Sequence, residues 1–133
     1  MKTVIIPVDF SETSLNAARY AAEMLSGKKD ASIILYNMYS HDDDYEISGH
    51  YLDSLKHELL QKGDKEIECI REMGDDLVDC LERLAYQKIA TLIVMGITGK
   101  SLVRQALVGS QTLKIAERDV CPVLIVPPEA KFN

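Results

Sequence analysis

The amino-acid sequence predicts an α/β fold in which a mostly parallel sheet carries helices on both faces. Short apolar runs rich in β-branched residues alternate with longer segments whose apolar residues recur every three or four positions. Such alternation of strands and helices is typical of βαβ units. A chain of 133 residues also suits one hydrophobic core. We therefore expect residues 1–133 to form a single domain.

Five apolar runs are the expected strands. The first, Lys2–Val8, is a continuous β-branched stretch ended by Asp9, which is typical of a strand buried on both faces. The run Glu66–Ile70 alternates polar with apolar residues, so we expect it near an edge of the sheet. The other three runs are Ala31–Met38, Thr91–Met95 and Val123–Val126.

Four helices are expected between these strands. Glycine stops the first at Gly27 and the second at Gly63, and either Asp75 or Asp76 is expected to cap the third. A fourth should begin at Gly109–Ser110. The inward-facing residues expected are Leu15, Ala18, Ala22 and Leu25 in the first helix, Leu52, Leu55 and Leu59 in the second, Leu77, Val78, Leu81, Leu84 and Ala85 in the third, and Leu113 and Ala116 in the fourth, which should end near Asp119.

The polar segment 41–50 is expected to be a loop. It contains three consecutive aspartates and shows neither the strand period nor the helix period. His41 and the aspartates Asp42–Asp44 have side chains that could bind a divalent metal. A run of like charges is more often only solvated, so we predict no metal site there.

Charge and composition exclude several classes of function. The formal net charge of -6 opposes binding to the phosphates of DNA or RNA, because that binding depends on lysine and arginine. No apolar run approaches the roughly 20 residues of a membrane span, and Met1–Thr3 leads into a strand rather than a signal peptide. Cys69, Cys80 and Cys121 form no CxxC pair and are expected to be free thiols. We expect a cytoplasmic protein that binds neither nucleic acid nor membrane.

Ligands of open α/β sheets bind beyond the carboxyl ends of the strands, where connections leave on opposite sides. Three segments lie at such ends, namely 7–11, 37–39 and 95–101. Glycine lets backbone N–H groups approach an anion, and the start of a helix adds further donors. Gly96, Gly99, Gly109 and Ser110 therefore suit a phosphate site. For Gly96 and Gly99 alone, a simple turn after a strand is the better interpretation.

Two common phosphate-binding loops are excluded. Gly99-Lys100-Ser101 matches the end of a Walker A loop, but that loop needs a glycine where Val94 stands. Val94 lies inside an apolar run, so the geometry fails as well. No dinucleotide-type GxGxxG occurs either.

The longer spacing is more specific. Gly96 is followed after two residues by Gly99, and Gly99 after nine residues by Gly109 and Ser110. This pattern resembles the nucleotide-binding signature of the universal stress protein family. The resemblance extends from Val4–Ser11 through Gly74-Asp75 to Cys121–Pro127. It implies a doubly wound, Rossmann-like sheet of five parallel strands in the order 3-2-1-4-5. A crevice between the first and fourth strands would then bind an adenine nucleotide, with ATP and AMP both open.

The same resemblance implies roles for individual residues. Asp9 would lie near the adenine and ribose, although holding a turn or capping a helix is the commoner job for such a residue. Asn37-Met38 replaces the more usual His-Val, and Thr98 stands where relatives often carry His. Mg²⁺ or Mn²⁺ would sit on the phosphates of ATP. The nucleotide-binding residues implied are Pro7, Val8, Asp9, Met38, Met95, Gly96, Gly99, Gly109, Ser110, Gln111 and Thr112.

The sequence identifies no catalytic residue, so we predict a binding protein of stress response or signalling. A phosphate cradle alone supplies no general base. Slow ATP hydrolysis and a nucleotide-independent dimeric interaction module of the same fold remain alternatives. The last strand, containing Val123, Leu124, Ile125 and Val126, would be an apolar edge. The resemblance implies that it pairs antiparallel with its copy in a homodimer.

Overall fold

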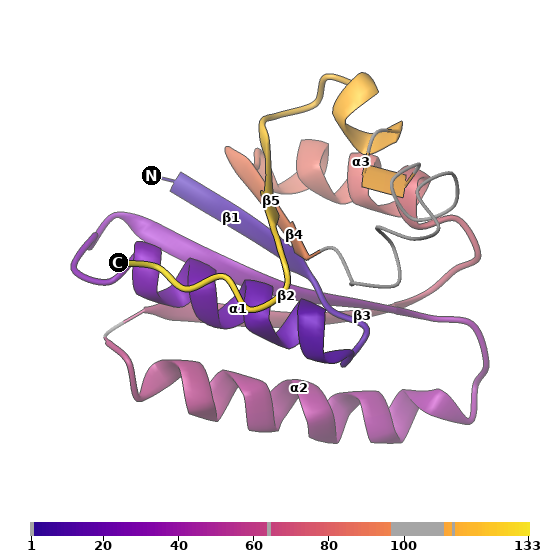
Figure 1. Ribbon diagram of the computed structural model, residues 1–133. Helices are drawn as coiled ribbons and strands as arrows, with labels where there is room; N and C mark the ends of the chain where they lie inside the picture. The colour runs from indigo at the N-terminus through magenta and orange to yellow at the C-terminus, as the bar shows by residue number, and fades with distance from the viewer. Residues whose placement is uncertain (1, 64, 97–110, 113) are drawn as a thin grey trace.

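The computed structural model describes residues 2–63, 65–96, 111–112 and 114–133. Its sheet has five parallel strands in the order β3-β2-β1-β4-β5, which confirms the predicted fold class and strand order (Figure 1). The strands and helices are β1 (Lys2–Pro7), α1 (Glu12–Met24), β2 (Ala31–Tyr39), α2 (Asp44–Leu60), β3 (Glu66–Met73), α3 (Leu77–Lys88), β4 (Leu92–Gly96) and β5 (Val123–Val126).

Two hydrophobic clusters form the core, one on each face of the sheet. On one face, α1 and α2 pack through small and aliphatic residues such as Ala18, Ala21 and Leu55. On the other face, Leu81 and Leu84 of α3 pack against the sheet. Because α1 follows β1 and α3 precedes β4, the connections of these adjacent strands lie on opposite faces (Figure 1). A crevice at their carboxyl ends follows from this topology.

The helix ends follow expected chemistry. Ser11 is the N-cap of α1, and its side chain accepts from the backbone N–H of Ser14. Asp76, rather than Asp75, caps α3, because its carboxylate accepts from the N–H of Asp79 at 3.0 Å. Gly27, just beyond α1, has φ 82°, a conformation that favours glycine. The edge position predicted for the third strand is also confirmed, since among the described strands β3 pairs with β2 alone.

The prediction of a loop over 41–50 holds for residues 41–43 but is wrong for 44–50, because α2 begins at Asp44. The apolar pattern of the buried helix face does not mark the start of α2 in the sequence, because the first buried residue of that face is Ser48. Two contacts hold this first turn. The guanidinium of Arg71 stacks 3.7 Å from the centre of the Tyr45 ring and donates from Nη1 to the Tyr45 carbonyl at 2.6 Å. Acidic residues near the helix start also favour it through the helix dipole.

The fourth expected helix is described only in part. Residues 111–112 and 114–117 are helical and end in a turn at 118–119, as predicted, whereas Gly109-Ser110 and Leu113 lie outside the described residues. The expectation that Ala116 faces inward is wrong. Ala116 is exposed, and its neighbour Ile115 is buried with 1% of its surface exposed. Within the described part of the chain, no helix is long and apolar enough to cross a membrane.

Candidate functional site

A cavity of about 260 Å³ lies at the carboxyl ends of β1 and β4. Its position is the one expected from the crossing of connections at these two strands. The predicted site residues that line it are Pro7, Val8, Asp9, Met38, Met95, Gly96, Gln111 and Thr112. The other predicted residues, Gly99, Gly109 and Ser110, lie outside the described part of the structure.

Four segments distant in sequence bring these residues together. Pro7 ends β1 and leads into the turn toward α1, whereas Met38 comes from the end of β2. Met95 and Gly96 are the last residues of β4. Thr112 belongs to the helical residues near the last strand and is buried. The sheet therefore places its three central strand ends around one opening.

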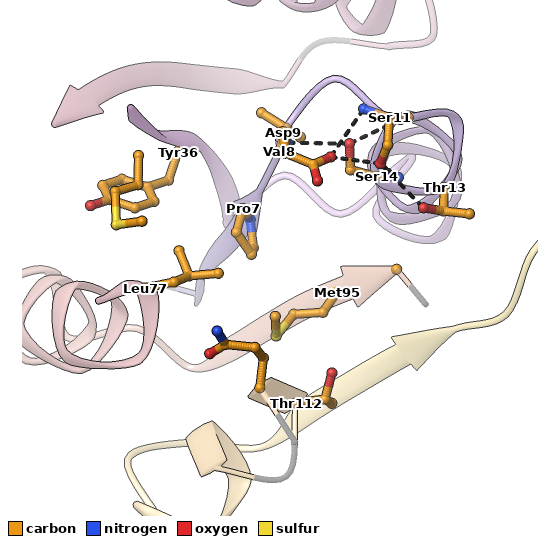
Figure 2. A pocket seen from close by; sticks show the side chains of 13 residues that line it. Pro7, Val8, Asp9, Ser11, Thr13, Ser14, Tyr36, Leu77, Met95 and Thr112 are labelled. Carbon is orange, nitrogen blue, oxygen red and sulfur yellow. Dashed lines mark hydrogen bonds between the residues drawn. The ribbon is translucent and has the colours of Figure 1, made fainter. Parts of the chain in front are cut away.

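The cavity has a hydroxyl-rich side, supplied by the turn into α1. Ser11, Thr13 and Ser14 line it together with Asp9, and Figure 2 shows them grouped at one side of the cavity. The Asp9 carboxylate accepts from both the backbone N–H of Ser11 at 3.0 Å and the Ser11 hydroxyl at 2.6 Å. Ser14 in turn accepts from the backbone N–H of Asp9. Asp9 therefore holds the turn, as its commoner role predicts, and also lines the cavity.

This network changes the acidity of Asp9. Burial of the carboxylate acts to raise its pKa, but hydrogen bonds from Ser11 and Ser14 together outweigh burial and hold the pKa below its ordinary value of 3.8. Asp9 is therefore a carboxylate at neutral pH. An anionic group at this position suits a hydroxyl-bearing partner, such as a ribose, better than it suits a phosphate.

The opposite side of the cavity is apolar. Tyr36 and Leu77 lie at that side, across from Ser11 and Thr13, and Pro7 and Met95 lie between the two sides (Figure 2). The Tyr36 hydroxyl donates to Glu72 Oε1 at 2.7 Å, and the same oxygen accepts from Arg83 Nη2 at 2.6 Å. Burial and the hydrogen bond to Glu72 raise the pKa of Tyr36, so its hydroxyl stays neutral.

Sequence reasoning missed part of the lining. Five residues line the cavity without having been predicted as site residues: Ser11, Thr13, Ser14, Tyr36 and Leu77. The hydroxyls had a usable signal, because three of the four residues 11–14 carry one and follow a strand end directly. Tyr36 had none, since an aromatic residue inside an apolar strand reads as core.

Gly96 has a packing role that its sequence position does not reveal. A Cβ added to Gly96 would lie 2.4 Å from the carbonyl oxygen of Thr13 and 2.9 Å from the carbonyl carbon. Helix α1 therefore approaches the end of β4 more closely than any other residue type would permit. This close approach keeps Thr13 and Gly96 on the same cavity wall.

Asn37 supports the turn from behind the cavity. The Asn37 side chain is buried, and its Nδ2 donates to the carbonyl of Val8 at 2.9 Å. Its Oδ1 has no hydrogen-bond partner among the described residues. The bond fixes the backbone where Val8 and Asp9 enter the lining.

The described residues contain no group of three or more His, Cys, Asp or Glu side chains arranged to hold a metal ion. The segment 41–50 is among these residues.

Comparison with known proteins gives one consistent family. The model described as "Universal stress protein family" matches residues 1–127. The chain is 30% identical over 142 residues to universal stress protein Rv1636 of Mycobacterium tuberculosis, an alignment covering 94% of this chain and 95% of the relative.

Two solved structures are also similar. A universal stress protein in complex with cAMP is 29% identical, has a TM-score of 0.78, and is covered over 96% of its chain and 95% of this one. The universal stress protein of Archaeoglobus fulgidus in complex with dAMP is 20% identical, with a TM-score of 0.73 and coverage of 94% of this chain and 96% of its own. At that identity, the second likeness speaks for the fold alone.

Proposed function

Since this chain belongs to the universal stress protein family, we propose that its cavity binds an adenine nucleotide and that the protein acts in stress response or signalling. The observation that carries the proposal is the gathering of eight predicted site residues around one opening. The cAMP and dAMP named for two similar structures are both adenine nucleotides with one phosphate. AMP shares this single phosphate, and ATP stays a candidate through the resemblance described above.

The polarity of the cavity supports one orientation of the ligand. The two faces of an adenine base are flat and apolar, and only its edge forms hydrogen bonds, whereas the ribose and phosphates are polar throughout. The apolar side, with Tyr36 and Leu77, and the neighbouring Met95 suit the base, and the side with Asp9 suits the ribose hydroxyls (Figure 2). The backbone of Met38 would then read the edge of the base, and Pro7 and Val8 would line the base pocket.

The phosphates would lie toward the residues that follow β4. Gln111 and Thr112 line the cavity there and belong to a helical segment. We propose that Gly99, Gly109 and Ser110 complete this end through backbone N–H groups. If ATP binds, Mg²⁺ or Mn²⁺ would be held by its phosphate oxygens.

Isothermal titration with AMP, ATP and ATP with Mg²⁺ tests the proposal, together with native mass spectrometry of freshly purified protein. We expect saturable binding of at least one nucleotide at concentrations up to about 1 mM. The Leu77→Glu variant should lose at least about tenfold in affinity, because it places a carboxylate against the base. Leu77 is only half-buried at the start of α3, where an acidic side chain is tolerated.

The control for this variant is Tyr86→Glu on the same helix. Tyr86 is 63% exposed and does not line the cavity, so its replacement adds the same charge without touching the ligand. Binding should be unchanged. Absence of binding by the parent protein with every nucleotide would contradict the proposed function and leave a nucleotide-independent interaction module as the better account.

We also propose a homodimer formed by β5. Within the described residues, β5 pairs only with β4, so its other edge is free for a second copy of the chain. Ile125 on this strand is 43% exposed. Light scattering should give twice the chain mass at micromolar concentration, and a monomer for Ile125→Lys; a monomeric parent protein would contradict the dimer.

A cytoplasmic location is part of the proposal. Cys69, Cys80 and Cys121 are all free thiols, which is usual in a reducing compartment. Fractionation of cells and detection of the protein with an antibody test the location directly.

Occupancy of the cavity would alter the surface around its mouth and so change binding of a partner protein.

A further inference from the structure

Tyr36 occupies an unusual position, because it is both core and cavity lining. Only 1% of its surface is exposed, yet it lines the apolar side of the cavity. The other residues of that side, such as Leu77, lie nearer the surface. Tyr36 therefore closes the cavity at depth, on the side opposite Ser11 and Thr13 (Figure 2).

The ring is held in place by groups from two other elements. Its hydroxyl donates to Glu72 of β3 at 2.7 Å, and Glu72 is itself bound by Arg83 of α3 at 2.6 Å. Rotation of the ring away from the cavity would break the first bond and leave a buried hydroxyl without its partner. The wall is therefore fixed rather than adaptable.

The direction of the hydroxyl also matters. Because it is committed to Glu72, the part of Tyr36 that faces the cavity is its carbon ring, and Figure 2 shows the hydroxyl oxygen on the far side from Pro7. This end of the cavity thus offers apolar surface and no added room. A group attached to a base would meet a rigid ring there.

On the basis of the proposed function, we propose that Tyr36 is a specificity-determining residue that sets the depth of the base pocket and restricts it to adenine without a bulky substituent. Glu72 is a positioning residue, because the hydrogen bond that it accepts from the Tyr36 hydroxyl holds the ring in place. A packing role alone would make Tyr36 important for stability but would leave the choice of ligand unaffected. Ligand preference therefore separates the two roles.

The test measures the affinity of AMP and of three analogues that carry a benzyl-type group at N6, C2 or C8. The parent protein should bind AMP, and it should bind at least one of the three analogues at least about tenfold more weakly, because only a substituent that points toward Tyr36 meets its ring. Tyr36→Ala should raise the affinity for at least one analogue, relative to the affinity for AMP, by about tenfold or more, because the smaller side chain opens the end of the cavity. Tyr36→Leu, which keeps more apolar volume and folds more readily, should shift the same preference to a smaller degree. Tyr36→Phe keeps the ring but removes its hydrogen bond to Glu72, so its preference should lie between those of the parent and Tyr36→Leu.

Leu81→Ala is the matched control. Leu81 is fully buried in the same hydrophobic cluster as Tyr36 but does not line the cavity, so its truncation destabilises this core without enlarging the pocket. Its ligand preference should equal that of the parent protein. If the parent binds AMP but Tyr36→Ala and Tyr36→Leu keep its preference, the inference is wrong while the proposed function stands. If the parent accepts every analogue as well as AMP, the inference is wrong as well. If it binds no adenine nucleotide, both fail.

Discussion

Replacement of Gly96 by alanine tests the close approach of α1 to β4. The added Cβ would lie 2.4 Å from the Thr13 carbonyl oxygen, which is about 0.9 Å inside the shortest comfortable carbon to oxygen contact. Both offending Thr13 atoms are backbone, so a helix or a strand must move. Overpacking of this kind costs about 1–3 kcal/mol, and removal of a glycine from a strand returns about 0.5–1 kcal/mol. Because no flexible side chain can yield, we take the upper end of the overpacking range, about 3 kcal/mol, which leaves a net loss of about 2 kcal/mol.

Urea unfolding followed by circular dichroism measures this loss, which corresponds to a midpoint lowered by roughly 1 M. The matched control is Gly49→Ala. Its added Cβ would also lie close to another atom, at 2.6 Å, but that atom is Nη1 at the flexible end of Arg71, which can move at the cost of its contacts with Tyr45. The substitution also favours helix α2 by about 1 kcal/mol, so stability should change little. A loss below about 0.5 kcal/mol for Gly96→Ala, or equal losses in both variants, would refute the reasoning.

Three other substitutions test local features of the fold. Asp76→Ala removes the side chain that caps α3 and should cost about 1 kcal/mol, whereas Asp75→Ala should cost almost nothing; equal losses in urea unfolding would contradict this assignment. Leu81→Ala should lower the free energy of unfolding by about 2–5 kcal/mol, since its side chain is fully buried, and a loss under about 1 kcal/mol would show that the site is loosely packed. Because the pKa of Asp9 is lowered in the folded state, its stabilisation is present above its ordinary value of 3.8 and is lost as pH falls through the folded pKa. Asp9→Asn should therefore lose less stability than the parent between about pH 6 and about pH 3, and parallel losses would count against the hydrogen bonds to Ser11.

The strand pattern was predictable because buried parallel strands leave a plain signal. The runs beginning at Lys2, Ala31 and Val123 all became strands at nearly the predicted bounds. Their alternation with helices was enough for the fold class. The order of the strands was not available from the pattern alone and came from the resemblance to a family, because hydrophobic periodicity does not say which strands are neighbours.

The failures have physical causes. The start of α2 was missed because its buried face opens with Ser48 and because Arg71, distant in sequence, supplies the contacts that hold Tyr45. Inward facing was assigned to Ala116 because it is apolar, whereas the actual helix phase buries Thr112 and Ile115. Each error arose where tertiary contacts, rather than local composition, decide the structure.

The lining of the cavity was predictable in part. Strand ends, glycine spacing and the resemblance to a family were enough to select eight residues that the fold brings to one cavity. The packing role of Gly96 and the cavity wall formed by Tyr36 depend on how α1 and β3 lie against the sheet. No residue pattern along the chain carries that information.

A crystal structure determined after soaking with AMP tests the central claim most directly. The account predicts electron density for the adenine between Tyr36, Leu77 and Met95, with the ribose beside Asp9. Density for the nucleotide at another surface, or an empty cavity in crystals soaked at about 10 mM AMP, would contradict it.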